Sequence, residues 1–240
     1  MPIVLYKQAA SPPARAALMI VDILGLKVET KEVNLATREH YAPEYVEKNP
    51  LHTVPLLEDE DLTLADSHAI LTYLVSKYGS DQHQKLYPKD LKARAIVDQR
   101  MYFDATILFQ RLKTVIYSVV KNNQKFSDEQ KAEIVEGYEI LEKYLQKTQY
   151  VAGNGVTVAD VSCVATVSAL NSILPIDKKF VKIHEWWSRL QKEEWWHEKD
   201  NIEGLKMFDG FINLLSAQLI VTNLVKFFFK YIVTLLVFFY

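Results

Sequence analysis

The hydrophobic pattern of the chain changes at Gly79, and this change constrains the fold more than any other feature. Before Gly79, short strand-like apolar runs alternate with helical ones. From residue 90 to about residue 216 the apolar residues recur at helical spacing, and no strand signal interrupts them. A chain of 240 residues can bury two modest cores. The sequence therefore predicts a small α/β domain followed by a larger all-helical one.

The first 79 residues predict the element order βαβαββα. Strands are expected over residues 3–6, 27–33, 54–57 and 62–64, and helices over residues 12–24, 41–48 and 67–78. Pro12 suits the start of the first helix and Gly25 its end, while Asp66 suits the start of the third. A parallel strand pair with a crossover helix, followed by an antiparallel hairpin, gives a small mixed sheet covered by helices.

The second half predicts helices over residues 91–120, 128–147, 180–190 and 203–215. Its strongest local signature is the run from Thr157 to Asp160, which fits a capping box with Thr157 as the N-cap. Val156 and Val161 have the spacing of a hydrophobic staple, so this signature is structural. The predicted division is residues 1–79 for the α/β domain, 80–89 for a linker, 90–216 for the helical domain and 217–240 for an atypical apolar tail.

Composition excludes several classes of protein. The chain has 28 Lys and Arg against 30 Asp and Glu, with no basic run, so nucleic acid is not expected as a partner. Its seven glycines form no dinucleotide, phosphate-loop or nucleophile-elbow motif, and its six histidines have no metal-ligand spacing, so no metal is expected. Cys163 is the single cysteine, and the first residues lack a secretory pattern, which together favour a cytoplasmic protein.

Ser11 is the first residue with chemical interest. A serine at this position would normally accept hydrogen bonds from the first-turn N–H groups, but Pro12 and Pro13 have none, so its hydroxyl is partly freed. The positive end of a helix favours an anion there. A thioredoxin-type fold would carry Cys-x-x-Cys at this corner; without cysteine, disulfide exchange is excluded, whereas stabilising another molecule's thiolate is not. The alternative is an ordinary Ser-Pro helix start.

The segment from Asn49 to Tyr73 has the parts needed to hold a peptide. Val54 precedes Pro55, so its backbone is extended and can pair with another chain. At the helix start after the hairpin, Ser67 and the free N–H groups can hold a carboxylate, and Asp66 can accept from an ammonium group. The alternatives are that Asp66 is an ordinary N-cap and that His52 is an ordinary loop histidine.

Four motifs in this order and spacing resemble a glutathione S-transferase: LY-(x)4-SPP-x-R, NP-x-HTVP, DSHAI-x-x-YL and the Thr-Val-Ala-Asp box. The Ser-Pro-Pro form with His-Thr-Val-Pro is similar to the insect epsilon class, with the delta class as neighbour. The resemblance covers residues 3 to about 215. It implies a thioredoxin-like N-terminal domain, an all-α C-terminal domain, a homodimer and a cis peptide bond before Pro55.

The resemblance also implies roles for individual residues. The implied glutathione-binding set is Ser11, His40, His52, Thr53, Val54, Pro55, Asp66, Ser67 and Arg111. Ser11 would be catalytic and hydrogen-bond the glutathione sulfur. Val54 would pair with the cysteinyl backbone, His52 and His40 would face the glycyl end, and Asp66 with Ser67 would hold the γ-glutamyl end. Many relatives carry Glu where this chain has Asp66, so the shorter side chain is expected to weaken or reposition the ammonium contact.

The implied pocket for the electrophile is lined by Ile107, Arg111, Thr114, Val115, Met207 and Phe211. Arg111 stands among apolar residues and must find an anion or water, which leaves a glutathione carboxylate, a polar electrophile or a surface ion pair as its partner. Relatives often have an acidic residue where Val115 stands, so an apolar pocket is expected. Aryl halides, organic hydroperoxides and chlorinated insecticides are all candidate substrates.

Residues 219–240 form an apolar tail beyond the resemblance. Their number suits a membrane span, but Lys226 and Lys230 in the middle nearly cancel the apolar contribution. Membrane contact through this tail is therefore possible but not favoured. A gene-model artefact is the preferred explanation, followed by a peripheral or extra docking helix.

The leading functional prediction is an enzyme that conjugates glutathione, its co-substrate, to small hydrophobic electrophiles in detoxification. The first alternative is a non-catalytic protein of the same fold that binds hydrophobic ligands or hormones. The second is a structural or translation-associated module. The joint presence of Ser11, His52, Asp66 and Ser67 argues against the second alternative.

Overall fold

The computed structural model describes residues 2–122 and 126–215. Its N-terminal part has the predicted order βαβαββα. The elements are β1 (Ile3–Lys7), α1 (Pro12–Leu24), β2 (Val28–Glu32), a 3₁₀ turn (Glu39–Tyr41), α2 (Pro43–Lys48), β3 (Leu56–Asp59), β4 (Leu62–Ala65) and α3 (Ser67–Tyr78). Gly25 ends α1 at φ 64°, a left-handed conformation that favours glycine, as predicted.

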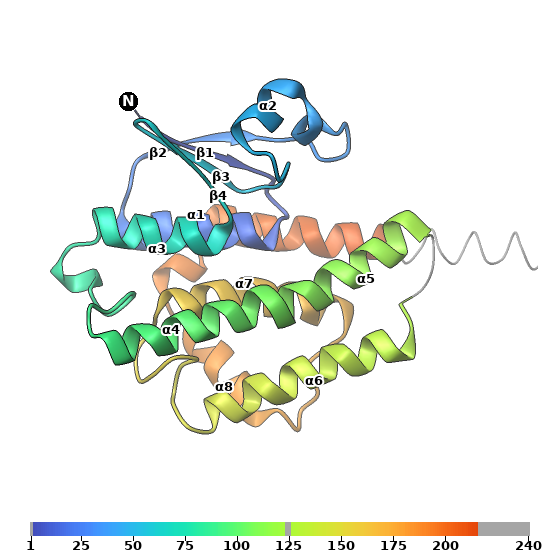
Figure 1. Ribbon diagram of the computed structural model, residues 1–240. Helices are drawn as coiled ribbons and strands as arrows, with labels where there is room; N and C mark the ends of the chain where they lie inside the picture. Colours follow the sequence, from blue (N-terminus) through green and yellow to red (C-terminus); the bar gives the residue numbers. More distant parts are fainter. Residues whose placement is uncertain (1, 123–125, 216–240) are drawn as a thin grey trace, which may run out of the picture.

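The sheet has the strand order β2-β1-β3-β4, with β1 and β2 parallel and the other neighbours antiparallel. Figure 1 shows α1 and α3 between this sheet and the helical part of the chain, with α2 on the opposite side of the sheet. Leu56 packs with Tyr45 of α2, whereas the next residue, Leu57, packs into the main core. Successive side chains of β3 thus point to opposite faces of the sheet and pack into two different cores.

The second part of the chain is helical. Its elements are α4 (Leu91–Phe103), a π-helical turn (Asp104–Leu108), α5 (Phe109–Asn122), α6 (Asp128–Leu145), α7 (Val158–Ile173), α8 (Val181–Leu190), a 3₁₀ turn (Glu194–Trp196) and a helix over residues 199–215. The prediction of one regular helix over residues 91–120 is wrong at the π-helical turn. Such a turn adds one residue per turn and leaves the apolar spacing on either side intact, so the pattern does not reveal it.

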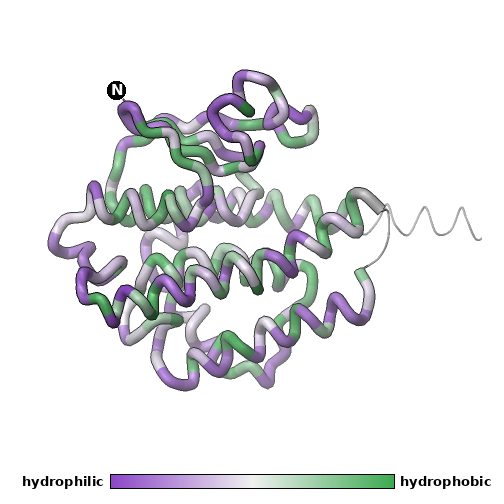
Figure 2. The backbone as a smooth tube through the Cα atoms, viewed as in Figure 1, coloured by the Kyte–Doolittle hydropathy of each residue, from purple (hydrophilic) through white to green (hydrophobic). Residues whose placement is uncertain are grey.

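The helix α7 is the centre of the helical part. Its residues are buried from Val158 to Leu170, and it packs against α1, α4 and α5. In Figure 2, by contrast, hydrophobic and hydrophilic residues alternate along the outer helix α6. A helix that is apolar on every side needs neighbours on every side, which explains why α7 is enclosed.

The predicted capping box at the start of α7 is confirmed. The Asp160 carboxylate accepts from the N–H of Thr157 (2.9 Å) and from its Oγ1 (2.8 Å). It also accepts from the N–H of Val151 (2.8 Å) and from Nε1 of Trp186 on α8 (3.0 Å). Burial raises the pKa of Asp160, and the four donated hydrogen bonds oppose that shift. One carboxylate thus joins α7, α8 and the loop before them.

Arg15 of α1 joins the two parts of the chain. Its side chain is wholly buried and donates from Nε (3.1 Å) and Nη2 (2.9 Å) to Oδ1 of Asn201, and from Nη2 to Oγ of Ser168 (3.1 Å). Gly204 lies so close that a Cβ there would stand 2.3 Å from the carbonyl oxygen of Ala9. The joint between the parts therefore depends on close backbone packing as well as on polar contacts.

Across residues 2–122 and 126–215, no helix is both long and apolar enough to cross a bilayer. The predictions for the tail concern residues 219–240, which lie outside the described residues.

Candidate active site

Ser11 stands at the turn between β1 and α1. It is the N-cap of α1, with extended backbone angles, and the first two helical residues are Pro12 and Pro13. Its Oγ accepts one hydrogen bond, from the N–H of Ala14, at 3.5 Å. That distance is beyond the usual 2.7–3.2 Å for such a bond. The hydroxyl is therefore weakly engaged at the positive end of a helix, as the two prolines predict.

The segment before β3 presents an open backbone. The peptide bond between Val54 and Pro55 is cis, as predicted. Two hydrogen bonds fix the backbone of Thr53. Its carbonyl accepts from the Tyr45 hydroxyl (2.7 Å) and from Nδ2 of Asn49 (2.9 Å). Within the described residues, the N–H and C=O of Val54 have no backbone partner. This leaves Val54 able to pair with an extended peptide.

Asp66 and Ser67 begin α3. Oδ1 of Asp66 accepts from the N–H groups of His68 (2.9 Å) and Ala69 (3.3 Å), so the N-cap role is confirmed. Within residues 2–122 and 126–215, the hydrogen bonds of Asp66 use Oδ1, and its side chain is 58% exposed, so Oδ2 can receive a second partner. The φ angle of Asp66 is 72°, a strained conformation for this residue type, and such strain is common at functional sites. The hydrogen bond from the His68 ring is the largest influence holding the pKa of Asp66 below its usual value.

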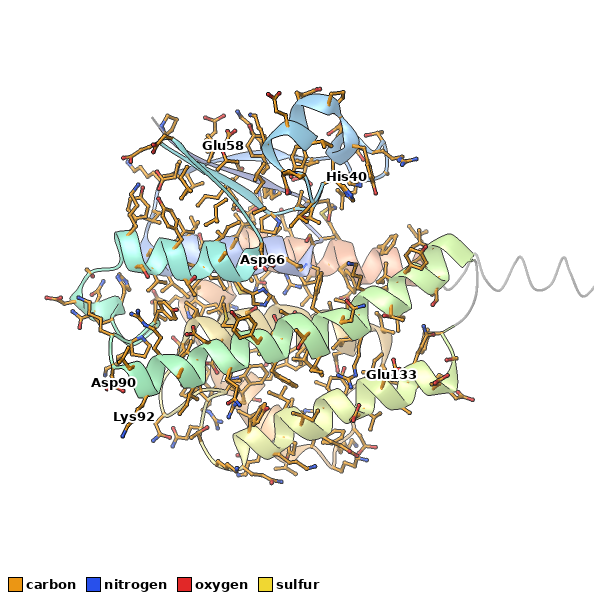
Figure 3. All side chains as sticks on the ribbon, in the orientation of Figure 1. His40, Glu58, Asp66, Asp90, Lys92 and Glu133 are labelled. Atoms are coloured by element: carbon orange, nitrogen blue, oxygen red, sulfur yellow. The ribbon has the colours of Figure 1, made fainter. Side chains whose placement is uncertain are left out.

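His40 and His52 lie at the two ends of α2 but meet through Tyr41. The Tyr41 ring is stacked on His52, with centroids 4.5 Å apart, and lies 4.4 Å from His40. Figure 3 places His40 beside α2 and Asp66 at the start of α3. Burial lowers the pKa of His40, helped by the nearby charges of His52 and Arg38. Within the described part of the chain, the buried Nδ1 of His40 has no hydrogen-bond partner.

Sequence reasoning missed two members of this aromatic cluster. Tyr41 separates the histidines, and the Arg38 guanidinium lies 4.7 Å from the Tyr41 ring centroid. The cation and the π face attract each other, which fixes the Tyr41 ring. The sequence signal for this cluster was the run from Arg38 to Tyr41, which contains three side chains that can stack. The contact of Tyr41 with His52 depends on the path of the folded loop.

His68 is the most consequential residue that sequence reasoning passed over. Its Nδ1 lies 3.3 Å from Oδ1 of Asp66, and its Nε2 lies 3.1 Å from Oδ2 of Asp104 in the π-helical turn. Burial alone would lower the pKa of His68, but the hydrogen bonds to Asp104 and Asp66 outweigh it and raise the pKa to about 9. The motif contained this histidine, yet its partner Asp104 is 36 residues away and was not associated with it.

The predicted electrophile-pocket residues are only partly available to a ligand. Met207 and Phe211 are exposed on the helix over residues 199–215, and Ile107 is half-buried in the π-helical turn. Thr114 is also half-buried and donates its hydroxyl to the carbonyl of Gln110 (2.9 Å). These four residues remain candidates.

Two residues of α5 that were expected at the electrophile pocket contact other parts of the protein. Val115 is 2% exposed and belongs to the core, so its side chain does not line an open pocket. Arg111 forms an ion pair with Glu136 of α6, and its guanidinium lies over Gly137. Of the three partners left open for Arg111, the structure contains the ion pair. The burial of Val115 was missed because apolar spacing identifies a buried face but not which neighbouring helix that face contacts.

Known families match both parts of the chain. The model for the glutathione S-transferase N-terminal domain matches residues 1–76, and the model for the C-terminal domain matches residues 98–194. Glutathione S-transferase 1 of Manduca sexta is 44% identical over 200 residues, which cover 82% of this chain and 91% of that protein. Glutathione S-transferase D7 of Anopheles gambiae is 35% identical over 79% of this chain and 86% of its own length.

Solved structures of glutathione transferases are also similar to this chain. An epsilon-class glutathione S-transferase from the housefly, Musca domestica, superposes with a TM-score of 0.85 at 44% identity, covering 89% of this chain and 98% of its own. A glutathione transferase homologue from Drosophila mojavensis with bound glutathione gives 0.84 at 40% identity, with coverage of 88% and 96%.

The chain therefore belongs to the glutathione S-transferase family and is a glutathione transferase enzyme, with glutathione as the co-substrate of the family. The predicted fold class, a thioredoxin-like N-terminal domain with an all-helical C-terminal domain, is confirmed.

Proposed function

We propose that this enzyme transfers the glutathione thiolate to small hydrophobic electrophiles in detoxification, with Ser11 as the catalytic residue. One observation carries this assignment: among the described residues, the Ser11 hydroxyl at the N-terminus of α1 has a single long hydrogen bond, because Pro12 and Pro13 have no N–H to donate. A hydroxyl so placed can donate to a sulfur anion.

The free energies of one hydrogen bond and one helix N-terminus are large enough for Ser11 to lower the pKa of a bound thiol. A free thiol with a pKa near 8.5 is only a few per cent ionised at neutral pH. Lowering that pKa by about two units requires about 2.7 kcal/mol of preference for the thiolate. A hydrogen bond to a charged group contributes about 1.5–3 kcal/mol, and a helix N-terminus about 0.3–1 kcal/mol. Ser11 and α1 together supply this preference, and the mechanism calls for no metal.

In the reaction, the thiol proton is lost to solvent and the Ser11 hydroxyl donates to the resulting thiolate. The sulfur then forms a bond to the electrophilic carbon, and the leaving group departs with its electron pair. The hydroxyl stabilises the ionised nucleophile without itself becoming charged. Binding energy from the tripeptide holds the sulfur in place, so the chemical step becomes effectively unimolecular.

The remaining site residues hold the tripeptide. Val54 offers its free backbone groups to the cysteinyl residue, with Thr53 and Pro55 fixing the segment, and His40 with His52 receives the glycyl carboxylate. Oδ2 of Asp66 accepts from the γ-glutamyl ammonium, and the γ-glutamyl carboxylate accepts from the hydroxyl and the N–H of Ser67, since the N–H groups of His68 and Ala69 already donate to Oδ1 of Asp66. Because Oδ1 of Asp66 is used by its own helix, the shorter side chain still leaves one oxygen for the ligand.

The electrophile class is hydrophobic. Met207, Phe211 and Leu214 form an exposed apolar row on the helix over residues 199–215. Exposed apolar groups gathered in this way suit an uncharged ligand. Aryl halides, organic hydroperoxides and chlorinated insecticides are the substrates to test.

A homodimer and a cytoplasmic location complete the proposal. Leu91, Ile96 and Tyr102 of α4 are exposed, at 80%, 43% and 70%, and a second copy of the chain would cover them. Light scattering coupled to size-exclusion chromatography tests this, since a monomer mass would contradict it. Cys163 is buried and unpaired, which supports a reducing compartment such as the cytoplasm.

The test separates catalysis from ligand carriage. The protein is passed over immobilised glutathione and then assayed for conjugation of glutathione to a chlorinated aryl substrate. Retention with turnover is the expected result. Retention without turnover would favour the alternative of a carrier for hydrophobic ligands, which the same apolar row would also suit. Loss of both would contradict the assignment of the site.

A further inference from the structure

A cavity lies between α2 and the sheet, on the face of the sheet that points away from the helical part of the chain (Figure 1). Its volume is about 580 Å³, within the range of small-molecule sites. Residues on or next to β1, β2, the first 3₁₀ turn and α2 line it, and none of them belongs to the glutathione-binding set. A ligand bound here would therefore be distinct from glutathione.

The floor of the cavity is apolar and aromatic. Val33 and Tyr45 are 4% and 7% exposed and belong to one small core. Tyr6 and Ala42 pack against this core, and the Tyr6 and Tyr45 rings meet edge to face with centroids 5.9 Å apart. The Tyr45 hydroxyl already donates to the carbonyl of Thr53 (2.7 Å), so Tyr45 offers its ring to the cavity. Such a floor suits the apolar body of a ligand.

The cations on the cavity wall are already paired. Lys48 lies 2.7 Å from the Glu58 carboxylate and donates to the Tyr6 hydroxyl (3.0 Å). Lys31 lies 5.3 Å from the Tyr6 ring centroid and 3.7 Å from the carboxylate of Glu29. An anionic ligand would have to compete with these carboxylates for the two ammonium groups.

The carboxylates on the wall are only partly paired. Glu32 lies 3.1 Å from Lys7, which balances its charge. Glu39 accepts from the N–H of Asn34 (2.7 Å), a neutral donor, and no cation of the described residues forms an ion pair with it. Glu44, in the first turn of α2, has neither a hydrogen bond nor an ion pair from its side chain within residues 2–122 and 126–215. Two negative charges on the wall therefore have no counter-charge from the described part of the chain.

We propose that this cavity is a second ligand site, which takes a small organic cation: an ammonium group on an apolar or aromatic body. The body packs on the Tyr6 and Tyr45 rings, and the ammonium group lies at the wall that contains Glu39 and Glu44. Charge complementarity selects a cation, because the cations of the wall are held by carboxylates of the chain while these two acids are not. The site is independent of the transferase reaction.

Three probes with closely similar bodies test the charge preference: phenethylammonium, phenethyl alcohol and phenylacetate. Binding to the full chain is followed by NMR at pH 7.5, from the shifts of the Tyr6 and Tyr45 ring signals. S-hexylglutathione is present in excess, so that the glutathione and electrophile sites are occupied. An exposed ion pair changes affinity by up to about fivefold, so two carboxylates should favour the ammonium over the alcohol by about tenfold. Phenylacetate should bind most weakly.

The variants test the two acids directly. Glu44→Gln should weaken the binding of phenethylammonium by about threefold to fivefold, and the double variant with Glu39→Gln should remove most of its advantage over the alcohol. Glutamine keeps the size of the side chain and an acceptor for the N–H of Asn34. Glu47→Gln is the matched control, because Glu47 is an exposed acid of the same helix that does not line the cavity, and it should bind as the wild type does.

Equal affinities for the three probes, or equal losses in Glu44→Gln and Glu47→Gln, would overturn the preference for a cation. A ligand of this size is expected to bind at about 1 mM, so absence of shifts at Tyr6 and Tyr45 with about 10 mM phenethylammonium would overturn the site itself. Failure of S-hexylglutathione to bind would refute the proposed function, whereas shifts of the two tyrosine rings in the same sample would still support the cavity.

Discussion

Replacement of Asp160 offers a severe test of how the helical domain is held together. Its carboxylate accepts four hydrogen bonds, from the N–H groups of Val151 and Thr157, the Thr157 hydroxyl and the indole of Trp186. In Asp160→Ala all four buried donors lose their acceptor. Each unpaired buried donor costs about 1–3 kcal/mol, and partial rescue by water or rotation makes the sum smaller than additive. The free energy of unfolding is expected to fall by about 4–5 kcal/mol. Few single substitutions destabilise a protein by more than this.

Asp160→Asn gives an intermediate result. Either orientation of the amide places an NH₂ group against two donors, because each carboxylate oxygen of Asp160 receives two hydrogen bonds. The neutral side chain also removes the penalty of burying a charge, which offsets part of the loss. The expected decrease is about 2 kcal/mol.

Urea unfolding followed by tryptophan fluorescence measures both variants, since Trp186 lies beside the substitution. Asp128→Ala is the matched control, because Asp128 is at a helix start but its side chain is 95% exposed, so its effect should stay within about 0.5 kcal/mol. Equal stability of Asp160→Asn and the wild type, or a loss below about 2 kcal/mol for Asp160→Ala, would refute this account of the cluster.

Three further substitutions test other parts of the structure. Gly204→Ala would place a Cβ 2.3 Å from the carbonyl of Ala9, so thermal unfolding should show a loss of about 1–3 kcal/mol, whereas Gly210→Ala, in open space on the same helix, should have little effect. Arg111→Ala should leave the affinity for glutathione within about twofold, since its partner is on α6; a loss near that of one charge-assisted hydrogen bond would contradict this. The pKa of His68 is about 9 in the folded protein and about 6.5 when unfolded, so its stabilisation is complete below pH 6.5 and is lost as the pH rises through 9. Relative to His68→Gln, the unfolding free energy of the wild type should fall by about 3 kcal/mol from pH 6.5 to pH 10.5, and parallel curves would contradict the shift.

Local chemistry explains what could be predicted from the sequence. Gly25, Asp66 and the run from Thr157 to Asp160 act within one helical turn of themselves, so their capping roles follow from residue type and spacing. Prolines 12 and 13 likewise determine the state of the Ser11 hydroxyl without help from the rest of the chain. The fold class follows because apolar spacing differs between strands and helices.

Contacts between distant elements explain what could not be predicted. The strand expected over residues 54–57 instead begins at Leu56, after a proline that has no N–H for the sheet, and it runs on to Asp59. The π-helical turn places Asp104 against His68, and no periodic pattern reports this pairing. The sequence left three kinds of partner open for Arg111, because the choice of Glu136 depends on how α6 packs against α5.

The candidate active site contains both kinds of residue: some could be predicted from local sequence, and others depend on contacts between distant elements. Ser11 and the segment from Thr53 to Ser67 could be recognised in sequence, since each part is short and ordered along the chain. The meeting of His40 and His52 depends on the path of the loop around α2, and their separation of 6.4 Å between ring centroids emerges only in the fold.

The central claim is that the Ser11 hydroxyl stabilises the thiolate of bound glutathione. The most direct test is the ultraviolet absorbance of that thiolate as a function of pH in the wild type, in Ser11→Ala and in Ser76→Ala, an exposed serine of α3 that serves as the control. Ser11→Ala should raise the thiol pKa by about 1–2 units, as the loss of about 1.5–3 kcal/mol requires, while the affinity for glutathione changes less. A thiol pKa unchanged from the wild type in Ser11→Ala would contradict the account.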